Sequence, residues 1–551
     1  MRRLLRPAVL AYLVCVASGV SVAFSFWPYR AGFVAYFVLV PFVIFSGLRD
    51  GAGRFLLKTY LFGLGYFGGS LYWIAMLDRD QIALPWLRVP AAAVLCLYLA
   101  LFILLAGWLT RRLVVAGVPF EIAFALAWAG AEYLRSLGPL GFPWASLGYS
   151  QTSYPVVAQQ AAVVGTYGIS AWLVLLNALL ARALTSPRAR FAVVAAAVAV
   201  FAAPVAGGWV VLSQARCPES VRVSLIQPNI SGAVKWDEAY RDSTLGILLE
   251  MSDGAGEAGE TGGGGAADLI VWPETAVPLY VKYSQAHLEM VAEAARRSGA
   301  SLLTGFPDYE HTNSGTRYYN SAMLVSAAGR IEGEYRKIHL VPFGEMIPFE
   351  QRIAFLRNIN FGEGDFSPGT AYHIFQADSV PFGVAICFES IFPNLVRGFV
   401  GRGARFIVNI TNDEWFGPSA GPYQHAEMAV MRCVEHRVAM ARCANTGVSM
   451  LIDPYGRVVR RTSLFAREVL AGSLPVTASG TPYTRWAGLI EAAFLGLPLA
   501  GAVVSYVRPR GSRGRGGRDR SRDQGRGGGK GFDTPAAPVI DSGQLREPRG
   551  R

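Results

Sequence analysis

The sequence predicts two structural classes in one chain, an α-helical multi-pass membrane domain and an α/β domain. Three observations lead to this prediction. Hydrophobic residues make up 52% of the 551 residues and charged residues only 16%, whereas a soluble globular chain carries about 25% charge. Apolar segments long enough to cross a membrane fill residues 1–213. In residues 214–485, short β-branched runs alternate with helix-like stretches, which indicates an α/β domain.

The membrane domain is expected to contain seven transmembrane helices, because apolar segments of roughly 20 residues follow one another there. They cover about 8–26, 32–48, 55–76, 87–109, 113–134, 160–183 and 190–213. An eighth apolar segment follows the α/β domain. We therefore expect four parts, which are a membrane domain (1–213), an α/β domain (214–485), an eighth transmembrane helix (486–507) and a C-terminal tail (508–551).

Basic residues near the ends of the apolar segments predict the orientation, because cytoplasmic loops carry an excess of Lys and Arg. They gather on alternate flanks, together with the Arg-rich tail: Arg2, Arg3, Arg6, Arg49, Arg54, Lys58, Arg111, Arg112, Arg182, Arg188 and Arg190. The other loops hold fewer, namely Arg30, Arg79, Arg88 and Arg135. Eight spans with both termini in the cytoplasm fit this alternation, so the α/β domain is expected outside the cytoplasm.

The loop Arg135–Pro155 between two apolar segments is rich in Gly, Pro and aromatic residues. Trp and Tyr are enriched where a membrane meets water, so Trp144 and Tyr149 are expected to anchor this loop at the outer interface. The same loop is a candidate for lining an opening toward the lipid.

The α/β domain is expected to contain seven short strands with helices between several of them. The predicted strands are Val221–Gln227, Leu269–Trp272, Ser301–Phe306, Ala322–Val325, Phe382–Ile386, Arg405–Ile410 and Ser449–Ile452. The predicted helices include Ala286–Ser298 and Ala426–Arg442. Cys433 and Cys443 would lie about 15 Å apart on the second helix, too far for a disulfide. The six cysteines show no metal-site spacing, so no structural metal is expected.

Most of the positive charge lies at the C-terminal end. The chain has a formal net charge of +12, and residues 508–551 hold twelve basic and five acidic residues. This distribution argues against a basic nucleic-acid-binding domain. The Gly/Arg-rich tail is expected to be disordered, near anionic lipid headgroups, and Gly254–Gly265 is expected to be a flexible insertion.

Three polar residues of the α/β domain have the chemistry of a nucleophilic site. Only a thiolate attacks, so Cys387 needs a base, and the carboxylate of Glu274 is suited to take its proton. Lys337 can stabilise the thiolate and then an oxyanion, and the backbone N–H of Phe388 is a second oxyanion donor. Taken singly, a buried cysteine, a capping acid and a solvated lysine would explain these residues as well.

In this order, the three residues resemble the Glu–Lys–Cys triad of the nitrilase superfamily, whose fold is an αββα sandwich. The resemblance covers most of 220–470. Because apolar spans flank the domain, nearly the whole chain except the tail resembles the apolipoprotein N-acyltransferase family. The matching stretches are IQPNI (Ile226–Ile230) with Lys235 and Trp236, WPET (Trp272–Thr275), YNSA (Tyr319–Ala322), LVPFGE (Leu340–Glu345), CFES (Cys387–Ser390), NITNDEWFG (Asn409–Gly417), Gln424 with His425, and Asn445–Gly447.

The resemblance implies a ping-pong acyl transfer. An acyl chain passes from a membrane phospholipid to a thioester on Cys387, and then to the N-terminal amine of a diacylglyceryl-cysteine in an apolipoprotein. The expected location is the bacterial cytoplasmic membrane. We expect no cofactor, no metal and no nucleic-acid partner. We expect the protein to be a monomer. Two alternatives stay open from the residues: a membrane-tethered amidase or nitrilase that gives the acyl group to water, and a non-catalytic scaffold for a polyprenol-phosphate glycosyltransferase.

The resemblance also assigns supporting residues. Glu345 corresponds to an additional acid that either orients Lys337 or tunes the charge of the site, and Glu389 is expected to shape the turn at the nucleophile. Three residues are implied in substrate binding, namely Trp236, Trp415 and Asn320. The segment Phe355–Phe366, which contains Gly362 and Gly364, is a candidate lid over the site.

Overall fold

The computed structural model describes residues 7–47, 51–77, 85–253, 255, 266–313, 315–349 and 366–507. Three predictions fall on the remaining residues. These are the disordered tail, the insertion at 254–265 apart from Ala255, and the lid at 355–366 apart from Phe366.

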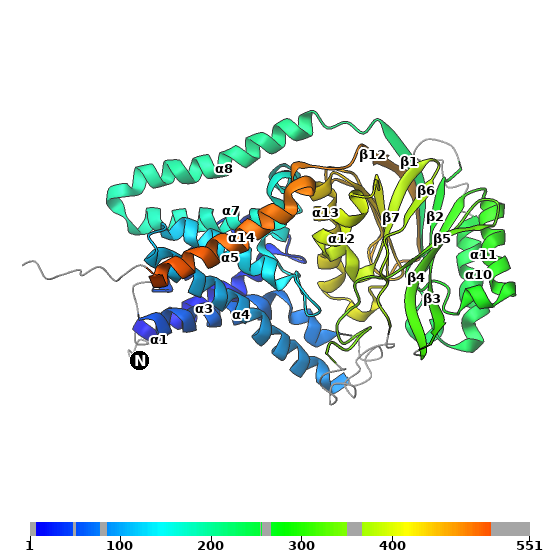
Figure 1. Ribbon diagram of the computed structural model, residues 1–551, viewed down its shortest axis with the longest axis horizontal. Coiled ribbons are helices and arrows are strands. Elements are labelled where there is room, and N and C mark those ends of the chain that lie inside the picture. The colour runs from blue at the N-terminus through cyan, green and yellow to red at the C-terminus, as the bar shows by residue number, and fades with distance from the viewer. Residues whose placement is uncertain are drawn as a thin grey trace, which may run out of the picture. The chain divides into compact units, whose positions relative to one another are not determined.

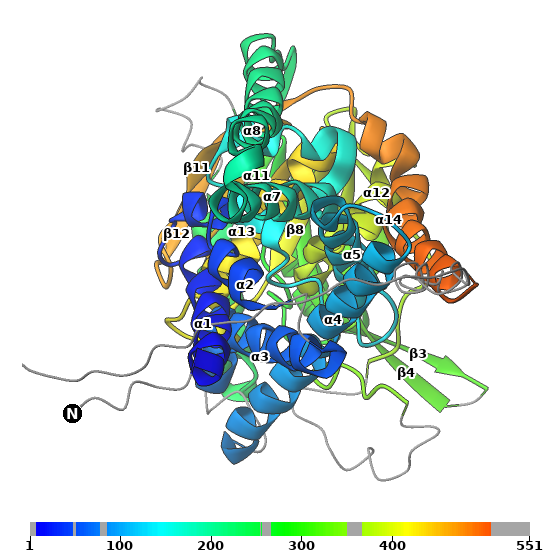
Figure 2. The ribbon, with the colours of Figure 1, turned by 90° about the vertical axis from the view of Figure 1, so that its left-hand side faces the viewer.

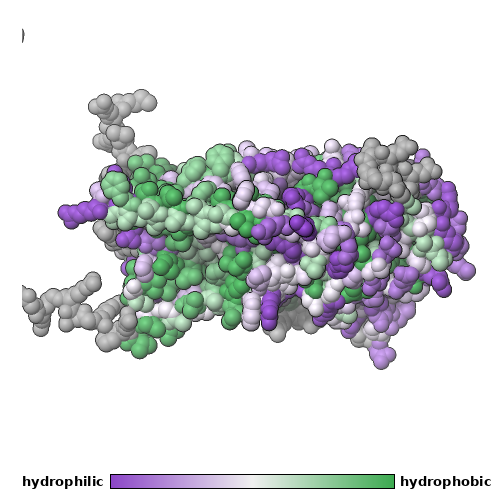
Figure 3. Space-filling view, turned by 90° about the horizontal axis from the view of Figure 1, so that it is seen from above, coloured by the Kyte–Doolittle hydropathy of each residue, from purple (hydrophilic) through white to green (hydrophobic). Residues whose placement is uncertain are grey.

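The N-terminal region is helical, with a helix at or near each predicted span (Figures 1 and 2). Its helices are α1 (Pro7–Ser21), α2 (Val40–Phe45), α3 (Ala52–Ser70), α4 (Arg88–Val115), α5 (Phe120–Arg135), α6 (Pro155–Ala158), α7 (Ala161–Thr185) and α8 (Arg190–Ser213), with 3-10 turns η2 (Gly32–Tyr36) and η3 (Tyr72–Met76) among them. The helix α14 (Pro482–Val507) joins this region from the C-terminal side. Hydrophobic side chains gather on the surface of this region, whereas hydrophilic ones cover the α/β domain (Figure 3).

Five helical segments within the described residues are long and apolar enough to cross a membrane. They are Ala8–Ser25, Arg88–Val115, Ala161–Thr185, Pro187–Ser213 and Pro482–Val507. The segment Gly32–Phe45 is apolar but shorter, and α3 and α5 are not among the five. The count of eight spans and the four domain ranges therefore stay predictions.

Glycine allows α1 and α3 to pack closely. A Cβ atom on Gly19 of α1 would collide with the carbonyl oxygen of Phe62 in α3, and one on Gly65 would collide with the carbonyl of Val16. In lipid, where water does not drive helices together, small residues permit the close backbone contact that holds them. We infer that this is why α1 and α3 tolerate glycines within their apolar sequences.

The α/β domain contains two six-stranded sheets. The first has the order β12-β1-β2-β3-β4-β5 and the second the order β11-β10-β9-β8-β7-β6. The strands of the first are β12 (Glu468–Val476), β1 (Glu219–Gln227), β2 (Leu269–Val271), β3 (Ser301–Thr312), β4 (Gly315–Val325) and β5 (Ile331–Arg336). Those of the second are β11 (Val458–Arg461), β10 (Met450–Ile452), β9 (Ala439–Ala444), β8 (Phe406–Thr411), β7 (Val380–Ile386) and β6 (Ile374–Ala377).

The sheets form the middle of a four-layer sandwich (Figure 1). Helices α12 (Pro393–Val400) and α13 (Gly421–His436) cover the second sheet, and α10 (Arg241–Asp253) and α11 (Gln285–Ser298) cover the first. Parallel strands β7, β8 and β9 lie at the centre of the second sheet, and every residue of β8 is buried. Parallel strands covered on both faces read as continuous apolar runs, which is why the sequence revealed them. The αββα sandwich is confirmed.

The predicted helix Ala426–Arg442 is wrong at its C-terminal end. Helix α13 ends at His436, where Arg437 adopts a left-handed conformation with φ of 50°, and the strand β9 begins at Ala439. Cys433 therefore lies on α13 and Cys443 on β9. Both thiols are free, as expected, but the reason is not their spacing along one helix.

The predicted membrane anchors Trp144 and Tyr149 are not at a lipid surface. Their side chains are 2% and 4% exposed, because α13 of the α/β domain packs over them. Trp144 Nε1 donates to Gln424 Oε1 at 2.8 Å, and Arg432 donates to the hydroxyl of Tyr149 at 3.1 Å. The loop 135–155 thus joins the two domains instead of anchoring one of them.

A second polar contact fixes α13 to the helical region. Gly165 interrupts α7 with φ of 68°, and the backbone N–H and hydroxyl of the next residue, Thr166, donate to Glu435 Oε1 at 2.8 and 2.6 Å. Arg432 forms an ion pair with the same carboxylate at 3.0 Å. A buried carboxylate needs such donors, so this contact should hold one docking position of α13 on the membrane helices.

Candidate active site

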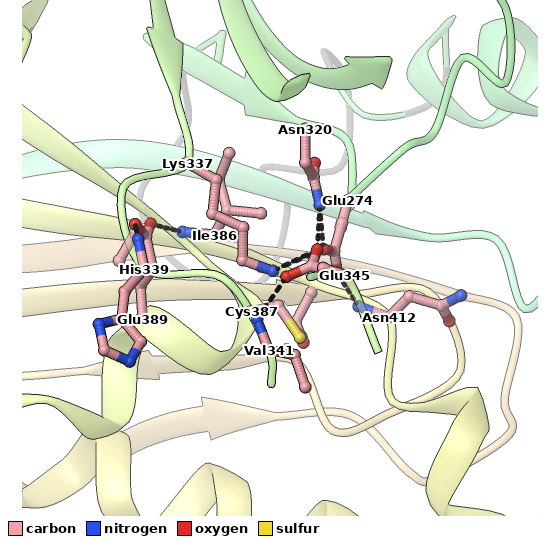
Figure 4. A network of polar contacts seen from close by, with 12 residues as sticks. Glu274, Asn320, Lys337, His339, Val341, Glu345, Ile386, Cys387, Glu389 and Asn412 are labelled. Carbon is pink, nitrogen blue, oxygen red and sulfur yellow. Dashed lines mark hydrogen bonds and ion pairs between the residues drawn. The ribbon is translucent and has the colours of Figure 1, made fainter. Parts of the chain in front are cut away.

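The ends of three strands bring Glu274, Lys337 and Cys387 together (Figure 4). Cys387 follows β7 directly, Lys337 follows β5 directly, and Glu274 lies three residues after β2. Lys337 Nζ lies 3.5 Å from Glu274 Oε1, and the thiol of Cys387 lies beside both groups (Figure 4). The sequence predicted these residues as a set, and the structure places them in one cluster.

Lys337 is held by two carboxylates. Its Nζ donates to Glu345 Oε1 at 2.8 Å, and Asn320 Nδ2 donates both to that oxygen at 2.9 Å and to Glu274 Oε1 at 2.8 Å. Lys337 is 1% exposed. Burial alone would lower its pKa, but the two carboxylates outweigh burial and raise the pKa above the ordinary value. The ammonium is therefore charged at neutral pH, and Glu345 fixes its position.

The second oxygen of each carboxylate is also fixed. Glu274 Oε2 accepts from the backbone N–H of Asn412 at 2.8 Å, and Glu345 Oε2 accepts from the backbone N–H of Val341 at 2.9 Å. Each carboxylate thus has donors on both oxygens, which orients it without a cofactor. Among the described residues, no group of three or more His, Cys, Asp and Glu side chains is arranged to hold a metal ion.

Cys387 sits on a strained turn. Cys387 has φ of 53°, a conformation that a residue with a Cβ rarely adopts. Its carbonyl accepts from Ser390 Oγ at 3.0 Å and from Asn409 Nδ2 at 3.4 Å, and His425 Nε2 lies 3.2 Å from it. These groups stabilise the turn, which leaves the thiol partly buried at the edge of a cavity.

The thiol of Cys387 is protonated in the resting site. Burial raises its pKa above the ordinary value, and the charge of Glu274 raises it further, while Lys337 acts in the opposite direction. A thiolate is therefore not stored in the site. A nucleophilic role of this thiol would therefore require a base that takes its proton during attack.

Glu389 anchors the turn that contains Cys387 through hydrogen bonds to both of its carboxylate oxygens. Its Oε1 accepts from Tyr335 Oη, Ile338 N and His339 N at 2.8, 2.7 and 3.0 Å, and its Oε2 accepts from Ile386 N at 2.7 Å. The side chain is fully buried. Burial raises its pKa, and the donors oppose this shift, with the result at about 7. A carboxylate with four donors suits the shaping role that the resemblance implied.

A buried network behind Cys387 was not assigned a role from the sequence. Asp413 lies 2.9 Å from His425 Nδ1 and 2.7 Å from Arg442 NH2, and Arg442 also contacts Asn409. Burial alone would raise the pKa of Asp413, but Arg442 and His425 lower it to about 2. The network holds His425 beside the Cys387 carbonyl. In the sequence, only the stretches NITNDEWFG and Gln424–His425 indicate this network. Arg442 gives no indication of it, because the sequence predicts Arg442 on a helix.

A cavity of about 1200 Å³ joins the triad to the membrane helices. Its wall includes Glu274, Asn320, Lys337, Glu345, Cys387 and Phe388, and also Trp73, Ile74 and Leu77, residues of α4, and Leu140, Gly141, Phe142 and Trp144. Lys235, Trp236 and Trp415 line it as well. Trp236 is 39% exposed. Nine residues were assigned from the sequence to catalysis, support or substrate binding. Eight of them line this cavity, and Glu389 does not.

Comparison with known proteins decides the family. The carbon-nitrogen hydrolase family model matches residues 222–482, and that of the apolipoprotein N-acyltransferase N-terminal domain matches residues 18–179. An apolipoprotein N-acyltransferase from Geobacter metallireducens is 36% identical over 500 residues, which cover 90% of this chain and 94% of that one. The chain belongs to the apolipoprotein N-acyltransferase family. It is an acyltransferase and a membrane protein, as the sequence resemblance implied.

A second curated relative agrees with this membership. An apolipoprotein N-acyltransferase from Brucella melitensis is 36% identical over 500 residues, which cover 87% of this chain and 91% of that one. Among solved structures, a member of branch 10 of the nitrilase superfamily from Saccharomyces cerevisiae is 20% identical and covers 47% of this acyltransferase and 90% of that chain, with a TM-score of 0.36.

Replacing Glu389 by Gln should destabilise this acyltransferase. The amide has one acceptor oxygen, so its NH2 group would face either Ile386 N or the three donors on the other side. A buried donor left without a partner costs about 1–3 kcal/mol. We expect a lower thermal midpoint in detergent and reduced activity, because the N–H of Ile386 adjoins Cys387. Glu310→Gln, at an exposed carboxylate, is the control. An unchanged midpoint with full activity would contradict the anchoring role.

The raised pKa of Glu389 predicts that the stability of the folded protein depends on pH. Its pKa is about 7 in the folded protein, against an ordinary value of 4.5, so the folded state binds the extra proton more tightly. Stability from this group is complete below about pH 4.5 and is lost as pH rises through 7. Glu389→Gln should therefore show a shallower loss of thermal midpoint than wild type between pH 5 and 8.

Proposed function

We propose that this enzyme transfers an acyl chain from a membrane phospholipid to the N-terminal amine of a diacylglyceryl-cysteine in an apolipoprotein, through a thioester on Cys387. Family membership supports lipoprotein N-acylation. The donor, the thioester and the residue roles below are our proposal. The observation that carries it is the cavity of about 1200 Å³, which Cys387 and the membrane helix α4 share.

The composition of the cavity supports a lipid donor. Aromatic and aliphatic side chains of α4, η3 and the loop 135–155 make up its membrane side, and the charged residues of the triad lie at the other. An acyl chain can lie along the apolar wall while its ester reaches Cys387. Binding both reactants in one space replaces encounters in solution by a local reaction.

In the first half-reaction, Glu274 takes the proton of the Cys387 thiol as the sulfur attacks the ester carbonyl carbon. Lys337 and the backbone N–H of Phe388 stabilise the oxyanion that forms. The tetrahedral intermediate collapses, the C–O bond breaks, and Glu274 returns the proton to the leaving alkoxide. The products are a thioester on Cys387 and a lysophospholipid. Because the resting thiol is protonated, this step depends on the base.

In the second half-reaction, the neutral amine of the acceptor attacks the thioester carbonyl carbon. Glu274 accepts the amine proton, the C–S bond breaks, and the proton passes to the sulfur. The same oxyanion donors act again. An amide and the free thiol result. Trp236 and Trp415, which line the cavity, are placed to bind the acceptor at the entrance.

The orientation of the chain follows from its basic residues. We propose that both termini are cytoplasmic and that the α/β domain lies outside the cytoplasm, next to the bacterial cytoplasmic membrane. The alternation of Lys and Arg among the loops supports this.

Blocking the acceptor amine tests transfer against hydrolysis. The purified enzyme, in mixed micelles with phospholipid, should acylate a diacylated lipopeptide with a free N-terminus and release lysophospholipid in equal amounts. With the same lipopeptide N-acetylated, turnover should stop after one lysophospholipid per enzyme. Continuous release of lysophospholipid and free fatty acid with the blocked peptide would show that water is the acceptor, and would exclude the proposed transfer.

A further inference from the structure

We propose that Arg88 binds the phosphate of the acyl donor. The inference rests on the proposed function, because it concerns the donor of that reaction. A phospholipid carries an anionic phosphate a few covalent bonds from the ester that Cys387 attacks. If the ester lies at the triad and the chain along α4, the phosphate needs a cation in the same cavity.

Arg88 lies at one end of the apolar wall. It is the first residue of α4, and it lines the cavity together with Ala91, Leu95 and Tyr98 of the same helix. Spacings of three, four and three residues put these four on one face. Tyr98 lies about 15 Å along the helix axis from Arg88. The face thus offers a cation followed by about ten residues of apolar surface, which matches a headgroup followed by an acyl chain.

The other two cations of the cavity wall are already engaged. Lys337 contacts the carboxylates of Glu345 and Glu274. Lys235 is 3% exposed and donates to the carbonyl of Glu274 at 3.1 Å. The described residues of the wall thus include three cationic side chains and two carboxylates, and both carboxylates contact Lys337. An anion in this cavity is electrostatically favoured, and Arg88 is the cation placed to receive it.

The geometry of Arg88 leaves donors for a ligand. The side chain is half-buried, and its NH1 donates to the carbonyl of Leu77 at 3.1 Å, which fixes the guanidinium between η3 and α4. A guanidinium has five N–H donors in a planar fork that fits phosphate oxygens. Partial burial strengthens such charge-assisted bonds relative to a fully exposed contact.

The test compares two donors, one that carries a phosphate-containing headgroup and one that lacks it. The first half-reaction is followed as acyl adduct on Cys387, with a diacyl phospholipid and with a diacylglycerol of the same chains, both in neutral detergent micelles. Arg88→Gln should lower the second-order rate of adduct formation from phospholipid by at least about tenfold, the scale of one charge-assisted hydrogen bond. The rate with diacylglycerol should stay within about twofold, and Arg88→Lys should recover part of the phospholipid rate.

Controls separate a binding role from a structural one. Arg216→Gln, at an exposed arginine that does not line the cavity, should match wild type with both donors. An equal loss with both donors in Arg88→Gln would mean that Arg88 only supports the fold, and an unchanged phospholipid rate would also overturn the proposal. Adduct from neither donor in wild type would refute the proposed function itself, and the phosphate site with it.

Inorganic phosphate distinguishes the source of the anion. If the site takes phosphate by itself, rising inorganic phosphate should slow adduct formation from phospholipid in wild type and not in Arg88→Gln. If only lipid-borne phosphate binds, neither protein should respond, while the difference between the two donors remains. Equal slowing in both proteins would place the phosphate effect elsewhere and would count against Arg88.

Discussion

Replacing Lys337 by Met should lower the rate of both half-reactions by at least about 100-fold, the cost of removing one oxyanion donor. The ammonium lies between Glu274 and Glu345, and Met keeps the length of the side chain without its charge. Adduct formation from phospholipid and discharge by a lipopeptide, measured in single-turnover experiments, should fall together. A loss in only one step would contradict the shared oxyanion role.

A matched control is Lys282→Met. Lys282 also contacts two carboxylates, Asp308 at 3.1 Å and Glu334 at 2.9 Å, but it does not line the cavity. Its loss should lower the thermal midpoint through unpaired carboxylates and leave the rate of the folded enzyme within about twofold. If Lys282→Met lost activity to the same extent as Lys337→Met, the effect of Lys337 would be one of stability.

Replacing Glu274 by Gln should cost about 10²- to 10⁴-fold in rate, the range for a general base. Burial raises the pKa of the Cys387 thiol. Without the base, the variant can react only through the small fraction of enzyme molecules in which this thiol is already ionised. That fraction rises about tenfold for each pH unit below the pKa. The residual activity of Glu274→Gln should therefore rise with pH across the range in which the enzyme stays folded, more steeply than that of wild type.

Glu345→Gln is the comparison for this prediction. Glu345 makes the shorter contact with Lys337, at 2.8 Å against 3.5 Å for Glu274, so it is the better placed to orient the ammonium. Its variant should lose rate without acquiring the steep pH dependence. If the two variants exchanged these behaviours, Glu345 would be the base and Glu274 the positioning residue.

Glu274 and Cys387 could be predicted from the sequence because each follows a buried strand that reads as an apolar run. Lys337 follows β5, which is mostly exposed or half-buried and is not among the predicted strands, so only the resemblance to the triad indicated it. The α/β class could also be predicted, since strands such as β8 are buried along their whole length and are mostly apolar, whereas the sandwich was implied by the family resemblance. A polar residue at the end of an apolar strand can be predicted from the local sequence, without knowledge of the segments that pack against it.

What the sequence could not predict depends on contacts between distant segments. Trp144 looked like a membrane anchor because nothing local shows that Gln424, 280 residues further on, accepts from its indole. Arg442 looked helical because no Gly or Pro marks the end of α13, which stops at Arg437 in a left-handed conformation. The role of Arg88 needs both the cavity and the partners of the other lysines, and neither is visible in a linear pattern.

The mass of the intact protein after mixing with phospholipid tests the central claim most directly. The account predicts one added acyl group, located on Cys387 by peptide mapping and absent in Cys387→Ala. The group should be lost rapidly when a diacylated lipopeptide with a free amine is added, and should appear on that amine. It should persist in buffer alone over the same time. Loss to water at the same rate without the lipopeptide, or an undiminished adduct in Cys387→Ala, would contradict the account.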